Sequence, residues 1–315
     1  MKIKTPKYPW RNYQFGTISL CMIMRDNAKT LARCLDSVVG LVNEIIIVDT
    51  GSKDNSIDIA KSYNAKVLTD PWQDDFARPR NIGIKQATCQ WILVLDPDEL
   101  VLAKDHDEIR QLTNDKKFAA FWVTTHNYAP KNFSLDYVIC GKGNDPIGEC
   151  EGYTPSTKTR FWKNGLGIRF EGVWHELTDW YIRRHKLLQG SAKFAVHHWN
   201  HEITQESAKA KGKFYLRMGE KKVKQWPNLA QARWELATAE LKAGLRKRAS
   251  KTLATAFRLG FNRPDMYFNL SRCQRLLGNI ELAELAFQKG VCVKYPALTH
   301  VDTTKKPFDL MLKDI

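Results

Sequence analysis

The chain lacks any apolar run long enough to cross a bilayer, for which a helix needs about 20 residues. Its first seven residues contain no apolar core of a secretory signal peptide. Its seven cysteines are odd in number and form no C-x-x-C pair, which argues against a disulfide framework and a zinc site. The cysteines are expected to be reduced thiols of a cytoplasmic protein, and 43% hydrophobic and 26% charged residues are typical of a soluble globular chain.

Three nucleotide-binding and hydrolase motifs are also missing. The first apolar run is not followed by G-x-G-x-x-G, and G-x-x-x-x-G-K-[ST] does not occur. These absences argue against a dinucleotide-dependent oxidoreductase and a P-loop NTPase. The nucleophile motif G-x-S-x-G does not occur either.

Positive charge is abundant but unevenly distributed. Residues 1–200 hold 27 Lys and Arg against 23 Asp and Glu, whereas residues 201–300 hold 19 against 8. The net charge of +15 therefore comes mainly from the C-terminal third. A concentrated positive field favours an anionic partner, although a basic helical face can also serve solubility alone.

The first hundred residues alternate strand and helix patterns. Strands are predicted at 17–24, 44–49, 65–68 and 91–95, and helices at 28–40, from 56 onward and at 77–88. Continuous apolar strands separated by helices indicate a parallel sheet covered on both faces. Ligands bind such sheets at the carboxyl ends of the strands, so Asp49 and Asp96 are expected at one cleft.

The segment from Trp91 to Glu99 joins a buried strand to three carboxylates, Asp96, Asp98 and Glu99. Crowded acids repel one another unless a cation or a hydrogen-bond network holds them. Alone, this cluster is more typical of a solvated turn after a strand than of a binding site. Further along, residues 118–123 predict a strand, and residues 159–170 predict a hairpin around Asn164-Gly165.

From about residue 202 the pattern is helical and repeats. Small and apolar positions recur 34 residues later: Leu236, Gly244, Ala249, Leu253 and Ala256 as Leu270, Gly278, Ala283, Phe287 and Gly290. A glycine between paired helices indicates a helix-turn-helix repeat, and the period resembles that of tetratricopeptide repeats. Two units are evident, and the segment 203–224 matches poorly as a third.

Four motifs in order then point to a family: Ser19–Asn27, Glu44–Asp54, Asp75–Asn81 and Trp91–Glu99. Together they resemble the family 2 glycosyltransferases, which have the α/β nucleotide-sugar-binding fold called GT-A, and in particular members with C-terminal tetratricopeptide repeats. The resemblance implies a GT-A domain over residues 1–201, a helical repeat domain over 202–300 and a tail over 301–315.

The resemblance gives roles to the acids. Asp98 is implied as a direct ligand of a divalent cation, Mn²⁺ or Mg²⁺, which neutralises the leaving diphosphate. Asp96 is implied to bind this metal or the sugar nucleotide, and Asp49 to accept a hydrogen bond from the base, which favours a uridine nucleotide. Glu99 is expected either to support the other two acids or to start a helix.

Basic and polar residues receive roles in the same way. Arg80 and Asn81 match an Arg-Asn pair at a helix start that contacts base or phosphate, and Arg25 is implied as a further nucleotide contact. Glu176 and His175 are the two candidates for the base that deprotonates the acceptor, and the sequence does not choose between them. His198 is implied as a third metal ligand.

The resulting hypothesis is a metal-dependent, inverting glycosyltransferase that moves a sugar from a UDP-sugar to a hydroxyl acceptor. The basic repeats suggest an anionic acceptor, either DNA with hydroxylated bases or a lipopolysaccharide core at the inner membrane face, and a peptide bound by the repeats is a third choice. The alternative from another class is a catalytically inactive module that scaffolds protein or nucleic acid.

Overall fold

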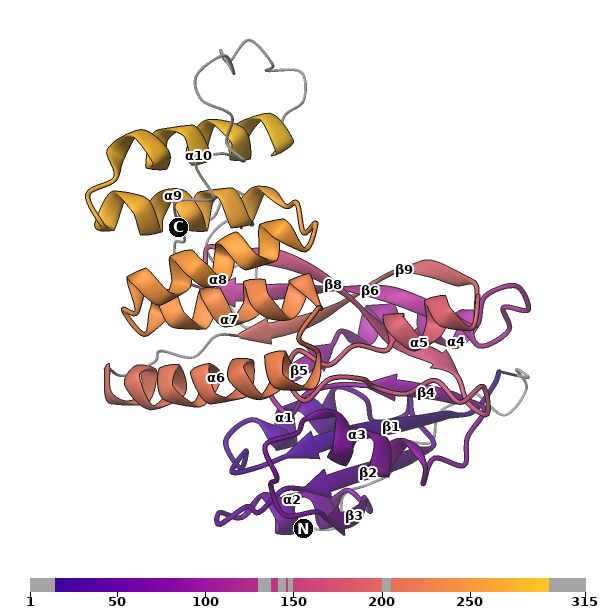
Figure 1. Ribbon diagram of the computed structural model, residues 1–315. Helices are drawn as coiled ribbons and strands as arrows, with labels where there is room; N and C mark the ends of the chain where they lie inside the picture. The colour runs from indigo at the N-terminus through magenta and orange to yellow at the C-terminus, as the bar shows by residue number, and fades with distance from the viewer. Residues whose placement is uncertain (1–14, 130–136, 141–145, 147–149, 200–204, 295–315) are drawn as a thin grey trace. The chain divides into compact units, whose positions relative to one another are not determined.

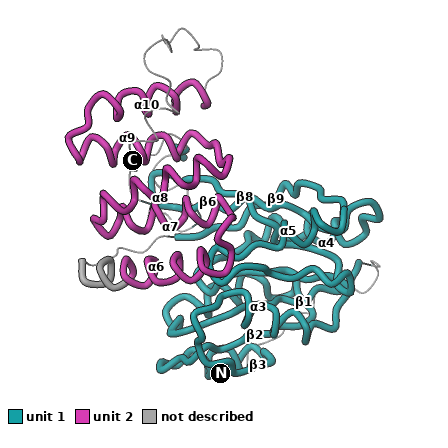
Figure 2. Tube along the Cα trace, viewed as in Figure 1, with its two compact units in different colours: residues 1–202 teal, residues 203–315 magenta. Residues whose placement is uncertain are grey.

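The computed structural model describes residues 15–129, 137–140, 146, 150–199 and 205–294, with side chains from residue 211 onward in the last stretch. The chain divides into two compact units, residues 1–202 and 203–315 (Figure 2). The predicted tail, residues 301–315, lies outside the described residues. None of the helices that the structure describes is long and apolar enough to span a membrane.

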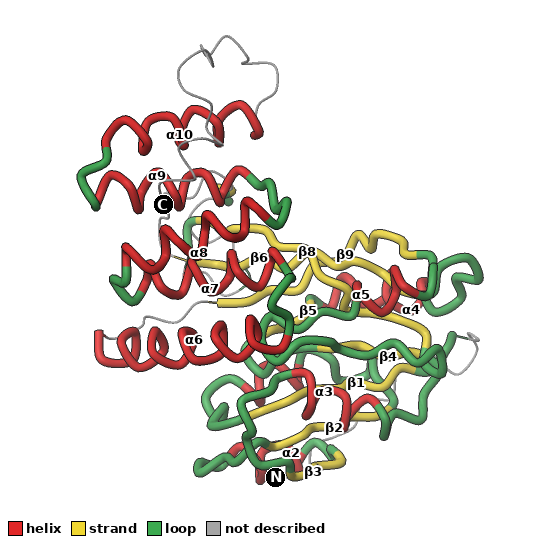
Figure 3. Tube along the Cα trace, viewed as in Figure 1, coloured by secondary structure: helices red, strands yellow, loops and turns green. Residues whose placement is uncertain are grey.

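Unit 1 is built on one nine-stranded sheet with strand order β3-β2-β1-β4-β8-β6-β9-β5, and β7 pairs with β8 (Figures 1 and 3). The strands are β1 Ile18–Met24, β2 Glu44–Asp49, β3 Lys66–Thr69, β4 Trp91–Val94, β5 Glu99–Val101, β6 Ala120–Ala129, β7 Val138–Ile139, β8 Gly152–Lys163 and β9 Gln189–Trp199. Strands β1 to β4 are mutually parallel, and β8 joins β4 in the antiparallel sense. The four predicted strands of the first hundred residues are confirmed.

Helices cover both faces of the sheet. They are α1 Leu31–Asp36, α2 Ser56–Ser62, α3 Ala77–Ile84, α4 His106–Leu112 and α5 Asp179–Arg184. Alternation along β1 divides the core: Leu20 and Met22 join α1 in one buried cluster, whereas Cys21 faces α3 and α5 in the other. Helix α3 lies close to the sheet because Gly83 has no side chain; a Cβ there would come within 3.2 Å of Val48 Cγ2.

The parallel pairing brings the carboxyl ends of the strands together. Met24 of β1 is paired with Asp49 of β2, and Asp49 with Thr69 of β3. Strand β4, which pairs with β1, ends at Val94, two residues before Asp96. The sheet therefore places the predicted acids along one edge, as the parallel topology requires.

The predicted hairpin around Asn164-Gly165 is wrong. Strand β8 ends at Lys163, and residues 166–170 form no strand. The turn is held from outside, because the Asn164 side-chain amide donates to the carbonyls of Ala87 and Cys89. The backbone N–H and carbonyl of Phe170 are bound by the side chain of Asn81, so they do not pair back onto β8.

Unit 2 is helical, with α6 Gln205–Gln225, α7 Ala230–Lys242, α8 Arg246–Arg258, α9 Pro264–Leu276 and α10 Ile280–Lys294. Helices α9 and α10 start 34 residues after α7 and α8, which is the period found in the sequence. The turns inside the two pairs contain Gly244 and Gly278, with φ of 77° and 85°. Only glycine adopts this conformation readily, which explains why it recurs.

Candidate active site

The loop from Asp96 to Glu99 joins β4 to β5 and is held by internal hydrogen bonds. The backbone N–H of Asp96 donates to Glu99 Oε2 at 2.8 Å, and the N–H of Glu99 donates to the Asp96 carbonyl at 3.0 Å. Glu99 does not start a helix; it is the first residue of β5. Of the two roles expected for it, support of the neighbouring acids fits the structure.

Glu99 is anchored by an arginine that the sequence motifs did not reveal. Arg160 of β8 donates from both terminal nitrogens to the Glu99 carboxylate, with Nη1 at 2.8 Å from Oε2. Both side chains are buried, and Arg160 Nη1 also lies 3.9 Å from Asp96 Oδ2. The available signal was that Arg160 directly precedes the apolar residues Phe161 and Trp162 in β8, because a charge buried among such residues is normally paired.

Arg80 connects two predicted functions. Its Nη2 lies 2.7 Å from Asp96 Oδ1, and its Nε lies 2.6 Å from Glu176 Oε1. Burial alone would raise the pKa of the Asp96 carboxyl, but the charges of Arg80 and Arg160 hold that pKa well below its usual range. The fold therefore brings the proposed donor-binding residues Arg80 and Asp96 to the candidate base Glu176.

Asp98 faces His198 of β9. His198 Nε2 lies 3.3 Å from Asp98 Oδ2, and its Nδ1 lies 3.1 Å from Asn127 Oδ1, which orients the ring. Burial would lower the pKa of His198, but the hydrogen bond and charge of Asp98 raise it. One carboxylate and one imidazole at this separation fit a divalent cation that completes its shell with phosphate and water oxygens.

The described residues contain no group of three or more His, Cys, Asp and Glu side chains arranged to hold a metal. The Asp96 carboxylate is turned to Arg80 at 2.7 Å, so in this arrangement it is engaged by an arginine. Asp98 and His198 remain the pair of predicted ligands that the structure places together.

The remaining predicted nucleotide contacts lie in different surroundings. The buried Asp49 carboxylate accepts the backbone N–H groups of Gly51 and Ser52, which caps the turn after β2. The Asn81 side chain uses both its polar groups on Phe170, and so positions that segment. Arg25 is about half-exposed beside Asp26.

His175 differs from its neighbour Glu176. It is exposed, adopts a φ of 46°, and its ring lies 4.1 Å from that of Trp174. The Glu176 side chain is only 11% exposed and is fixed by Arg80. Of the two predicted base candidates, Glu176 is the one that the structure joins to the acidic loop.

With this geometry established, comparisons with known proteins identify the family. The family model described as glycosyl transferase family 2 matches residues 19–187, more than half of the chain. The chain belongs to this family. The match covers the four motifs and the segment that contains Glu176. The predicted resemblance to family 2 glycosyltransferases is confirmed, and so is the fold class, a GT-A domain followed by a helical region.

Two curated relatives align with about half of this glycosyl transferase family 2 chain. A TPR repeat-containing protein of Synechococcus elongatus is 38% identical over 162 residues, which cover 51% of this chain and 35% of that protein. Glycosyltransferase SunS of Bacillus phage SPbeta is 28% identical over 162 residues, covering 51% of this chain and 34% of SunS. The chain spans about a third of the length of these relatives.

Among solved structures, S. aureus TarS 1-349 in complex with UDP-GlcNAc aligns with 87% of this chain and 88% of its own, at 13% identity and a TM-score of 0.42. A likeness of this size says nothing about the substrates of the family 2 chain.

Proposed function

We propose that the protein is a metal-dependent, inverting glycosyltransferase that moves a sugar from a nucleotide-sugar donor, a UDP-sugar, to a hydroxyl acceptor. The observation that carries the proposal is the bridge formed by Arg80 between Asp96 and Glu176. It joins a residue of the acidic loop to a second carboxylate across 80 residues of sequence. Family membership supports the reaction class.

The donor half of the site lies at the carboxyl edge of the sheet. Asp98 and His198 would hold Mn²⁺ or Mg²⁺, which when bound supplies positive charge to the leaving diphosphate. Arg80 sits on α3 between Asp96 and Glu176 and keeps the Asp96 carboxylate ionised and fixed in place. Asp49, at the end of β2, is proposed to accept from the base while it caps its own turn.

Glu176 is the proposed base. A base must lie within hydrogen-bond reach of the acceptor hydroxyl and be held in a fixed orientation. Arg80 fixes Oε1 of Glu176, which leaves Oε2 as the oxygen that takes the proton. His175 is exposed at the neighbouring position. It is the second candidate, which would contact the acceptor rather than Arg80.

The transfer activity of variants at Glu176 and His175 distinguishes the two candidates. Purified protein is incubated with Mn²⁺ and UDP-glucose, UDP-galactose or UDP-N-acetylglucosamine, and released UDP is measured with and without acceptor. Glu176→Gln is expected to reduce transfer by at least about 100-fold, whereas His175→Gln changes it much less. The matched control is Glu108→Gln, a carboxylate far along the chain on α4. Full transfer by Glu176→Gln contradicts the assignment.

The acceptor is proposed to be polyanionic because unit 2 carries excess positive charge. Residues 211–294 hold 18 Lys and Arg against 6 Asp and Glu. Five of those acids already pair with a cation, among them Glu220 with Arg248 at 2.6 Å and Glu235 with Lys222 at 2.6 Å. The excess of basic over acidic residues is proposed to attract phosphates of DNA with hydroxylated bases or of a lipopolysaccharide core.

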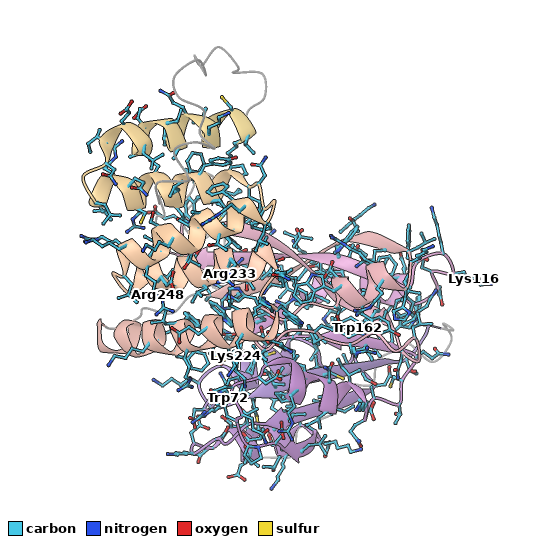
Figure 4. All side chains as sticks on the ribbon, in the orientation of Figure 1. Trp72, Lys116, Trp162, Lys224, Arg233 and Arg248 are labelled. Atoms are coloured by element: carbon cyan, nitrogen blue, oxygen red, sulfur yellow. The ribbon has the colours of Figure 1, made fainter. Side chains whose placement is uncertain are left out.

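One face of α6 shows this charge clearly. The exposed residues Lys213, Arg217 and Lys224 lie at helical spacing, and Figure 4 shows Lys224 on α6 and Arg248 on α8. A mobility shift with duplex DNA, and sedimentation with vesicles that contain lipopolysaccharide, test the two acceptor classes. Binding is expected to weaken about 10³-fold or more between 50 and 200 mM salt if six or more phosphates are contacted.

The matched variants are Lys213→Glu/Lys224→Glu on α6 and Lys61→Glu/Lys85→Glu in unit 1, all at exposed positions. The first pair is expected to lose most of the binding and the second to keep it. Equal binding by both double variants, or binding that is indifferent to salt, contradicts a polyanionic acceptor and favours a peptide bound by the repeats.

A further inference from the structure

A small cavity adjoins the bridge of Arg80 in unit 1. It has a volume of about 30 Å³, and its walls come from α3, the end of β4, β8 and residues 170–179. A water-sized group needs at least about 10–15 Å³, so the cavity accepts one or two such groups and not a whole sugar ring. Arg80, Asp96 and Glu176 form part of the wall.

Three of the residues that line this cavity each have one hydrogen-bond donor with no acceptor among the residues that the structure describes. These donors are Nη1 of Arg80, Nε of Arg160 and Oγ1 of Thr178, and all three atoms are buried. The other nitrogens of Arg80 are used by Asp96 and Glu176, and those of Arg160 by Glu99. Buried donors are normally satisfied, so three at one cavity call for an oxygen from outside the fold.

The charges around the cavity decide what kind of oxygen fits. Arg80, Arg160 and Lys158 supply three positive charges. The carboxylates of Asp96, Glu176 and Asp179 line the same cavity, and Glu99 lies behind Arg160. A carboxylate or phosphate entering here would add negative charge to a cluster that is already one charge negative. A neutral hydroxyl accepts from the free donors without that repulsion.

We infer that this cavity recognises one neutral hydroxyl or hydroxymethyl group of the transferred sugar, with Thr178 as a specificity-determining residue. The inference rests on the proposed function. Two walls of the cavity, Arg80 and Asp96, are proposed donor-binding residues, which assigns the entering group to the donor sugar. The small volume of the cavity excludes larger substituents, and the negative charge of its surroundings disfavours the carboxylate of a uronic acid.

Thr178 is the residue to change. It is 1% exposed, and its hydroxyl is the one uncharged donor of the three. Thr178→Val keeps the shape of the side chain and removes only an unpartnered hydroxyl, so the fold is expected to be as stable as that of the unaltered protein. The matched control is Thr157→Val, an exposed threonine on the same strand as Arg160 that does not line the cavity.

The experiment compares kcat/KM for the best of UDP-glucose, UDP-galactose and UDP-N-acetylglucosamine with its single-deoxy analogues and the analogue without the hydroxymethyl group. One analogue is expected to be at least about 100-fold poorer than its parent, because a site built for a hydroxyl rejects the compound that lacks it. In Thr178→Val the ratio of kcat/KM between the parent sugar nucleotide and this analogue is expected to shrink to less than about 10-fold. The substitution lowers kcat/KM for the parent but not for the analogue. Thr157→Val keeps the full gap.

The outcomes are separable. If none of the three sugar nucleotides is consumed, the proposed function fails and this inference with it. If the unaltered protein is active but Thr178→Val keeps the same gap for every analogue, the cavity holds water only and this inference alone is overturned. Equal use of the corresponding UDP-uronic acid overturns it as well. Thermal unfolding of Thr178→Val within about 2 °C of the unaltered protein excludes misfolding as the cause.

Discussion

Removing Arg160 should destabilise the protein more than removing any surface arginine. Arg160 and Glu99 have side chains that are 5% and 4% exposed, and their pairing is bidentate. In Arg160→Met the Glu99 carboxylate stays buried with one remaining donor, the Asp96 N–H at 2.8 Å. Leaving one partner of a buried ion pair unpaired costs about 3–5 kcal/mol.

The comparison that isolates this effect uses two further variants. Replacing both partners, in Glu99→Leu/Arg160→Met, removes the unpaired charge and should recover most of the lost stability. Arg184→Met breaks the ion pair of an exposed arginine with Glu171 and should cost at most about 1 kcal/mol.

Urea unfolding followed by near-ultraviolet circular dichroism measures these differences. Transfer activity should stay low in the double variant although its stability returns, because the Asp96–Glu99 loop has lost its anchor. If the unfolding free energy of Arg160→Met lay within about 1 kcal/mol of that of the unaltered protein, the prediction would be wrong and the pair would contribute little to the fold.

Two further predictions concern buried groups. Burial, and less so His126 and Lys104, lowers the pKa of His197 to about 4, so between pH 6.5 and 4 the unfolded chain binds a proton that the folded chain does not. The free energy of unfolding should therefore fall by on the order of 3 kcal/mol as the pH is lowered from 6.5 to 4. The urea midpoint of His197→Phe should depend less on pH than that of the unaltered protein. An unchanged pH dependence would contradict this prediction. In unit 2, the side chain of Lys222 is fully buried and pairs with Glu235. Thermal melting should show that Lys222→Met is destabilised by about 3–5 kcal/mol. The same substitution at the exposed neighbouring residue, Lys221→Met, should hardly change the stability.

The sequence was sufficient where local patterns repeat. The four strands up to Val94 are continuous apolar runs, and buried parallel strands require such runs. The helical pairs of unit 2 followed from the 34-residue period and from Gly244 and Gly278. The acids fell at one sheet edge because parallel strands end together.

The rest depended on contacts distant in sequence. The hairpin prediction failed because Asn81, 89 residues earlier, holds the Phe170 backbone. Glu99 gave no local sign of pairing with Arg160, 61 residues later. The link between Arg80 and Glu176 is of the same kind. Sequence motifs identify such residues one at a time. Their function depends on which of them the folded sheet brings into contact, and the motifs do not show this.

The proposed mechanism depends most on a cation that is held at Asp98 and assists departure of the diphosphate. The direct test is Mn²⁺-dependent release of UDP from the best UDP-sugar, compared between the unaltered protein, Asp98→Ala and the exposed control Asp107→Ala. We expect Asp98→Ala to lose at least about 100-fold of the metal-dependent rate and Asp107→Ala to keep it. Full turnover by Asp98→Ala with the metal chelated would contradict it.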